Sequence, residues 1–169
     1  LQEQRTAFAF GRATPASEVP LSGTANYSGL IYGYSELPKA TASNQLPYTI
    51  TGTGQIAFDF GARSFTGSIA PTATNPATGT SYVLATRTFG SAVAGSSPYS
   101  AGSVDFVANF ANSHPFIQSF FTGHFTGPGA AEMRGEWSTF FTDPVNGGDL
   151  TMLGIGAIIG AGIFVLTGT

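Results

Sequence analysis

The sequence predicts an all-β fold, namely an eight-stranded antiparallel up-and-down barrel with a side-chain-filled interior. Segments in which apolar and polar residues alternate recur at a spacing of roughly ten residues, which is typical of consecutive antiparallel strands. No stretch between residues 11 and 142 keeps a helical periodicity over more than a few residues. A hydrophobic content of 42 % argues against disorder. Eight strands would close such a barrel around an interior that side chains just fill.

The composition excludes several classes of function. The 169 residues suffice for one domain with a sizeable core. Charged residues make up only 9 % of the chain, far below the roughly 25 % of typical soluble domains. The net charge of −3 and the scattered basic residues give no electrostatic footprint for nucleic acid. Because the chain has no cysteine, disulfides, thiolate catalysis and cysteine-ligated zinc are excluded.

The first half of the chain predicts an irregular start followed by three strands. Residues 1–20 form an irregular N-terminal segment, because prolines interrupt it. The strands are expected at 24–34, 48–60 and 64–70, and the last two are joined by a tight hairpin connection. A polar loop at 35–47 separates the first two strands. The residues of the second and third strands that alternate toward one face are Ile50, Ile56, Phe58, Phe60, Phe65, Gly67 and Ile69.

In the next part of the chain, strands alternate with loops rich in Gly, Ser and Pro. Residues 71–80 are interpreted as a long loop, 81–89 as a fourth strand and 90–102 as another loop. A fifth strand follows these loops. Its expected inward residues are Val104, Phe106, Ala108 and Phe110.

Residues 119–138 predict a β-hairpin that is broken by a Gly-Pro-Gly sequence at 127–129. In its second strand, Glu132, Arg134 and Glu136 share one face. Because an unpaired buried charge is costly, this face must be solvated and the opposite face must look into the core. The residues that we expect to face the core are Phe121, Gly123, Phe125, Met133, Gly135 and Trp137.

This hairpin also contains the pattern G-x-F-x-G-P-x-A-x-E, followed by a glycine and an aromatic residue. The pattern resembles the signature of the β-barrel domains of transferrin-binding protein B-like surface lipoproteins of Gram-negative bacteria. Thr126 stands where that family usually has an aromatic residue. The stretches 20–29 (PLSGTANYSG) and 58–69 (FDFGARSFTGSI) are similar to the same family, so the resemblance covers roughly residues 6–142. The matching signature residues are Gly123, Phe125, Gly127, Pro128, Ala130, Glu132, Gly135 and Trp137.

The resemblance implies a non-enzymatic binding module at the cell surface, outer membrane or periplasm of a Gram-negative bacterium. It is similar to the barrels of transferrin-binding and haem-scavenging lipoproteins, in which loops grip a host iron protein. We therefore expect a protein partner bound through loops 35–47, 71–80 and 90–102, and no cofactor. The alternative is a structural or assembly subunit of a larger surface or membrane complex, in which phenylalanines would cover a constitutive interface.

The C-terminal segment leaves several interpretations open. Residues 150–169 carry no charge, and as a helix they would be about 30 Å long, enough to cross a bilayer. Residues 149–168 resemble the first transmembrane segment of amino-acid permeases, and a tail fused from another protein is a further interpretation. As a strand, residues 149–160 would complete a barrel domain over 21–160 and leave 161–169 as an apolar tail. We favour the strand because the barrel otherwise lacks its last one, while membrane association through 150–169 stays open.

No catalytic constellation is found. Glu132 and Glu136 flank Arg134 on one strand face, and a solvated charge ladder is favoured over a glycosidase pair, which needs a partly desolvated cleft. We expect Glu132 to tie the hairpin turn. His114 and His124 are the only histidines, and their spacing predicts no zinc site. His114 is the candidate haem ligand, with a turn or surface histidine as the favoured interpretation.

Overall fold

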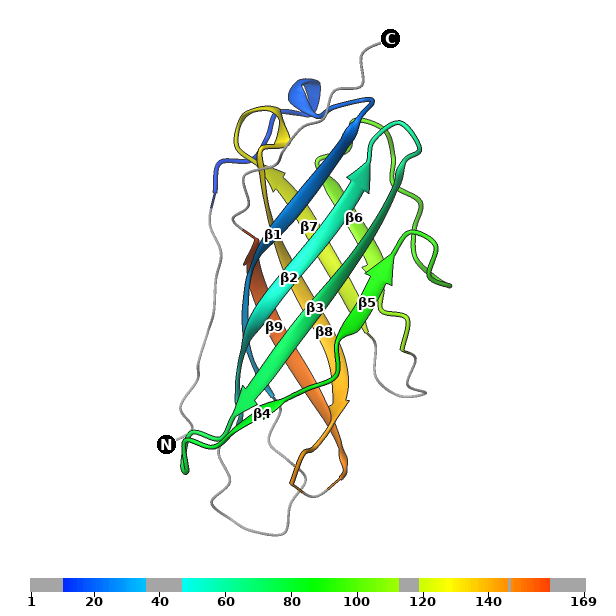
Figure 1. The fold of residues 1–169 in the computed structure, drawn as a ribbon. Helices are drawn as coiled ribbons and strands as arrows, with labels where there is room; N and C mark the ends of the chain where they lie inside the picture. Colours follow the sequence, from blue (N-terminus) through cyan, green and yellow to red (C-terminus); the bar gives the residue numbers. More distant parts are fainter. Residues whose placement is uncertain (1–10, 36–46, 113–118, 146, 159–169) are drawn as a thin grey trace.

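A computed structural model of the chain describes residues 11–35, 47–112, 119–145 and 147–158, and its strands form a tilted antiparallel barrel (Figure 1). This confirms the predicted fold class. The domain boundaries after residues 20 and 160 stay predictions. The strands are β1 (Thr24–Ser35), β2 (Thr49–Asp59), β3 (Ser64–Thr74), β4 (Ser81–Val83), β5 (Arg87–Gly90), β6 (Asp105–Asn109), β7 (Phe120–Thr126), β8 (Glu132–Thr142) and β9 (Asp149–Ile158), with short 3-10 helices η1 (Ala16–Glu18) and η2 (Pro128–Ala130).

The strands follow the order β4-β3-β2-β1-β9-β8-β7-β6, and β5 also pairs with β3. β9 lies between β1 and β8, so that the backbone of Ala157 is in register with both Leu30 and Arg134. The segment that begins at Asp149 is therefore a barrel strand up to Ile158, and its likeness to a permease segment has no support. In the described ranges no helix is long and apolar enough to cross a membrane. Residues 159–169 lie outside the described part.

The sheet is not closed by a continuous ladder, because β5 and β6 meet at a single bridge. Phe89 pairs with Phe110, and the amide of Ala111 donates to the carbonyl of Thr88 at 2.8 Å. Beyond this bridge the edge of β6 is capped by side chains of the 91–103 segment. The amide of Asn109, for example, donates to Oγ of Ser96 at 2.7 Å. Local caps thus complete the barrel where backbone pairing stops.

The predicted fourth strand at 81–89 is split into β4 and β5, and the predicted loop at 71–80 begins later than expected. β3 continues to Thr74, so the first residues of that loop belong to the sheet. Between the β4 and β5 pairings, three residues oppose only two of β3, which is a β-bulge. Pro71 lies opposite this bulge, and its carbonyl accepts from the amide of Leu84 at 3.0 Å. Because proline has no N–H to return a bond, the ladder is interrupted at this point.

The core fills the barrel interior, as the alternating pattern predicts. Every aromatic and aliphatic residue expected to face inward on the second and third strands is buried. On β6 the prediction holds for Phe106, Ala108 and the adjacent Phe110, while Val104 is only partly buried. The largest fully buried side chains are Trp137, Tyr27, Phe58, Phe60, Phe65, Phe121, Phe125, Phe141, Ile31, Ile50, Ile56 and Ile69.

Inside the barrel, aromatic rings lie directly on glycines of neighbouring strands. A Cβ at Gly123 would come within 2.1 Å of the Phe106 ring, and one at Gly154 within 2.1 Å of the Trp137 ring. Both pairs are directly opposite in register. Any side chain at these positions would occupy space that the ring already fills, so glycine is required by packing. The same contact recurs where Phe89 lies over Gly67 and Phe121 over Gly135.

We predict that Gly154→Ala destabilises the protein by about 1–3 kcal/mol, because the new methyl group overpacks the Trp137 ring. Urea unfolding measures the change. The control is Gly61→Ala, whose Cβ would meet nothing closer than 3.5 Å. Adding Trp137→Phe to Gly154→Ala should recover part of the loss. Equal costs for the two alanine substitutions would contradict the packing explanation.

We also predict that a chain ending at Gly148 does not fold to a soluble monomer. Removing β9 leaves the facing edges of β1 and β8 unpaired, and open edges drive aggregation. Size-exclusion chromatography with light scattering checks this, and a chain ending at Ile158 serves as the control. A monodisperse, strand-rich product of residues 1–148 would show that β9 is dispensable.

Candidate protein-interaction surface

The signature hairpin turns through backbone conformations that few residues adopt. Gly127 and Gly129 have φ angles of 76° and 61°, in the left-handed region that glycine tolerates. Ala130 also has a positive φ, 58°, although it carries a Cβ. Its side chain is fully buried, so tertiary contacts hold it in this costly conformation.

The turn is tied down by residues far away in the sequence, and not by Glu132 as we expected. The hydroxyl of Tyr27 donates to the carbonyl of Ala130 at 2.8 Å. Oγ1 of Thr14 donates to the carbonyl of Gly127 at 2.7 Å. The side chain of Glu132 is exposed and forms no hydrogen bond within the described ranges. The carboxylate that reaches the turn is that of Glu18 in η1, which accepts from the amide of Gly129 at 3.3 Å.

Burial keeps the Tyr27 phenol neutral. Desolvation raises its pKa well above the ordinary value of 10, and the nearby Tyr99 adds to the shift. A neutral phenol remains a donor to the Ala130 carbonyl over the whole physiological pH range. The signature residues other than the exposed Glu132 therefore belong to the turn and to the core beneath it.

Tyr27→Phe should lower the free energy of unfolding by about 1–3 kcal/mol, because the buried carbonyl of Ala130 loses its donor. Glu132→Gln should change it by less than about 0.5 kcal/mol, as is usual for an exposed residue. Chemical denaturation of the two variants beside the wild type measures both effects. If Glu132→Gln proved as costly as Tyr27→Phe, the motif glutamate would after all tie the turn.

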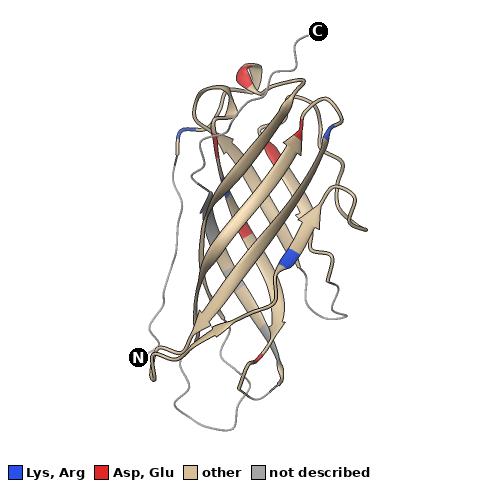
Figure 2. Ribbon diagram, viewed as in Figure 1, with Lys and Arg blue, Asp and Glu red and all other residues tan. Residues whose placement is uncertain are grey.

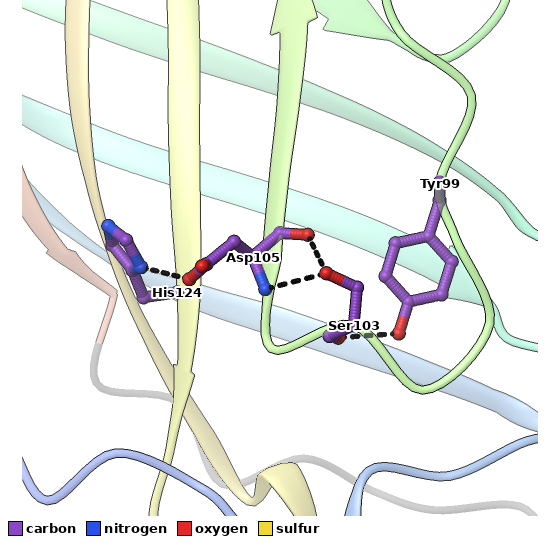
Figure 3. A network of polar contacts seen from close by, with 4 residues as sticks. All are labelled: Tyr99, Ser103, Asp105 and His124. Carbon is purple, nitrogen blue, oxygen red and sulfur yellow. Dashed lines mark hydrogen bonds and ion pairs between the residues drawn. The ribbon is translucent and has the colours of Figure 1, made fainter. Parts of the chain in front are cut away.

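A chain of polar contacts links the 91–103 segment to the outer face of β6 and β7 (Figure 3). The Tyr99 hydroxyl donates to the carbonyl of Ser103 at 2.8 Å. Oγ of Ser103 donates to the carbonyl of Asp105 at 2.8 Å and accepts from its amide at 3.2 Å. The carboxylate of Asp105 contacts Nδ1 of His124 across the two strands.

This network anchors a loop and does not form a catalytic triad. The Ser103 hydroxyl points to the backbone of Asp105 and not to His124, so no histidine activates it. Burial raises the pKa of Tyr99 to about 12, which keeps the phenol protonated. His124 is 39 % exposed, as expected for a surface histidine. In the described part of the chain no three carboxylate or histidine groups come together as metal ligands.

The other predicted charged residues lie on the outer face of β8. Glu132 and Glu136 are exposed, whereas Arg134 is half-buried and in register with His124 of β7. Two solvated carboxylates lack the desolvation that a glycosidase acid requires. The candidate haem ligand His114 lies outside the described residues.

The two predicted recognition loops that the structure describes do not form one surface. Residues 36–46 of the first loop lie outside the described part. The tip of the second loop, Asn75–Thr80, lies at the opposite end of the barrel from the 91–103 segment (Figure 1). This tip is a tight turn, in which the amide of Asn75 donates to the carbonyl of Thr80 and Oδ1 of Asn75 accepts from Ala77. The two described loops would therefore engage a partner separately.

The 91–103 segment is anchored to the barrel through Tyr99, Ser103 and Ser96. Tyr99 is buried against Phe58 and Phe60 and closes one end of the core. This role was not predicted from the sequence, although Tyr99 is an isolated aromatic residue in a loop of small residues. The segment also borders a shallow hollow of about 680 Å³ on the outer wall, whose lining residues carry no charge. Its polar lining residues are Asn26, Ser28, Gln55, Thr66, Ser68 and Thr88 of the strands, Tyr27, Ile56 and Phe89 add apolar groups, and Ala92 and Val93 come from the loop.

The wall around this hollow carries almost no charge. β1 and β3 contain no Lys, Arg, Asp or Glu, and β2 has only Asp59 at its end. Figure 2 shows these strands uncoloured along most of their length, while charged residues mark the ends of the barrel and the strands β5, β6 and β8. A partner on this side would meet hydroxyl and amide groups, which both donate and accept hydrogen bonds.

Comparison with known proteins gives a consistent result. A family model described as C-lobe and N-lobe beta barrels of Tf-binding protein B matches residues 19–155. A double mutant of transferrin-binding protein B from Haemophilus parasuis is similar to the chain, with 18 % identity and a TM-score of 0.48 over 87 % of this chain and 28 % of that one. The isotype 1 transferrin-binding protein B from serogroup B Neisseria meningitidis is 21 % identical, with a TM-score of 0.44 over 86 % of this chain and 28 % of that one. The chain thus spans little more than a quarter of these proteins. No match was found among curated protein sequences.

Proposed function

This chain belongs to the family of transferrin-binding protein B β-barrels, and on that premise we propose that it is a protein-binding module. Members of the family are non-enzymatic surface lipoproteins of Gram-negative bacteria, so the chain is a domain of a protein at that cell surface. Its partner is a host protein, and transferrin is the first candidate because the description of the family names it. The sections of chain that contact the partner are loops of the barrel.

The observation that supports this function best is the 91–103 segment beside the neutral hollow. Its backbone is held by the buried Tyr99 and by Ser103, so little conformational entropy is lost when a partner binds. Ala92 of this segment is exposed at the rim of the hollow, where a partner can reach it. We therefore place recognition in loop 90–102, with loops 35–47 and 71–80 as separate, secondary contacts.

The test measures binding of purified chain to immobilised iron-loaded and iron-free transferrin by biolayer interferometry. We expect saturable binding by the wild type and at least about tenfold weaker binding by Ala92→Glu, which places a charge at the neutral rim; tenfold corresponds to about 1.4 kcal/mol. The control is Thr142→Glu, an exposed change at the end of β8. Absence of saturable binding would exclude transferrin as the partner. Unchanged binding by Ala92→Glu would exclude the loop.

A second function, a structural or assembly subunit of a surface complex, is favoured by one feature of the outer wall. Leu30 is 71 % and Tyr32 is 40 % exposed on the uncharged β1. Apolar and tyrosine side chains without neighbouring charges are typical of protein interfaces. Sedimentation velocity separates the two functions, because a binding module alone sediments as a monomer and an assembly subunit self-associates.

A further inference from the structure

Arg87 is the one basic residue of β5 and is coloured blue in Figure 2. Its side chain lies on the interior side of the barrel wall. Phe89, two residues further along the strand, is buried in the core, and alternation places Arg87 on the same face. A cation on this face departs from the otherwise apolar pattern of the interior. The sequence analysis assigned it no role.

The guanidinium is held in place by β8, which lies across the gap in the sheet. One terminal nitrogen, Nη2, donates to the carbonyl of Phe140 at 3.3 Å. The guanidinium carbon lies 4.8 Å from the ring centroid of Phe141 and 5.7 Å from that of Phe140. These contacts orient the planar group but leave most of its donors unused. Nε is buried and has no acceptor, and among the described residues no acceptor contacts Nη1.

The surroundings contain polar groups but no counter-charge. Within the described ranges no carboxylate forms an ion pair with Arg87, and burial alone lowers its pKa. Asn112 follows the residue that bonds to Thr88, so its backbone lies beside that of Arg87. Its amide nitrogen donates to Oγ1 of Thr139 at 3.3 Å, while its Oδ1 is buried without a donor. Arg87 and an asparagine whose amide oxygen has no donor thus lie on neighbouring stretches of backbone.

We propose that Arg87 is the binding site for a small monocarboxylate anion. A carboxylate matches the planar guanidinium fork and would use the donors that the protein leaves free. One negative charge neutralises the one positive charge in partly apolar surroundings. A phosphate dianion would leave an excess charge between the two phenylalanine rings, which is unfavourable.

The experiment follows the Nε–H signal of each arginine by NMR while sodium acetate replaces sodium chloride at constant ionic strength. We expect the Arg87 signal to move along a saturable curve and the signals of the exposed Arg12 and Arg63 to stay nearly unchanged. The melting temperature of the wild type should rise with acetate. A linear shift shared by all three arginines, or no shift, would overturn the proposal. A larger saturable effect with sodium phosphate would overturn the choice of a monoanion.

Variants separate a binding role from a purely structural one. Arg87→Gln should lose the acetate-dependent rise in melting temperature, whereas Arg12→Gln should keep it. Arg87→Lys, which keeps the charge without the fork, should show a smaller rise. A variant of Arg87 that folds and still shows the full rise would exclude this site. If Arg87→Gln fails to fold, the wild-type titration alone decides, because it reports on Arg87 directly.

Discussion

The barrel depends on aromatic rings that occupy the space above glycines of adjacent strands. Where Phe106 faces Gly123 or Trp137 faces Gly154, the ring takes the volume that a side chain would need. Such a contact forms only when the two strands are in one register, because a shift by one residue turns every side chain to the other face. The rings therefore set strand alignment as well as filling the core. They act on both sides of β8, which links the signature hairpin to the last strand.

The signature residues are explained by this packing and by the turn. Gly123 and Gly135 lie under rings, and Gly127 adopts a positive φ at the turn. None of these roles requires contact with another molecule. A family signature of this kind identifies the scaffold. Under the proposed function, recognition rests on segments outside the signature, for which we propose the 91–103 segment.

Much of the fold was predictable because alternation alone distinguishes the two faces of a strand. The inward residues of β2, β3 and β7 follow directly from it, and β9 follows from the need for a final strand. The split of β4 and β5 was not predictable, since it depends on how Pro71 of β3 meets a bulge in the adjacent strand. Contacts between distant segments were also missed. The tie between Tyr27 and the Ala130 carbonyl, and the position of Arg87 against β8, join residues with no common local pattern.

The single bridge between β5 and β6 makes the molecule mechanically uneven. Along most of the barrel, neighbouring strands are joined by long ladders, so sliding or separating them breaks many hydrogen bonds at once. At the β5–β6 boundary only Phe89 and Phe110 pair, and hydroxyl caps such as Ser96 replace the backbone. Lateral tension on the described part of the barrel would unzip this boundary first. A domain at a cell surface that is pulled by its partner would thus yield along one defined line while the β1–β9–β8 side stays intact.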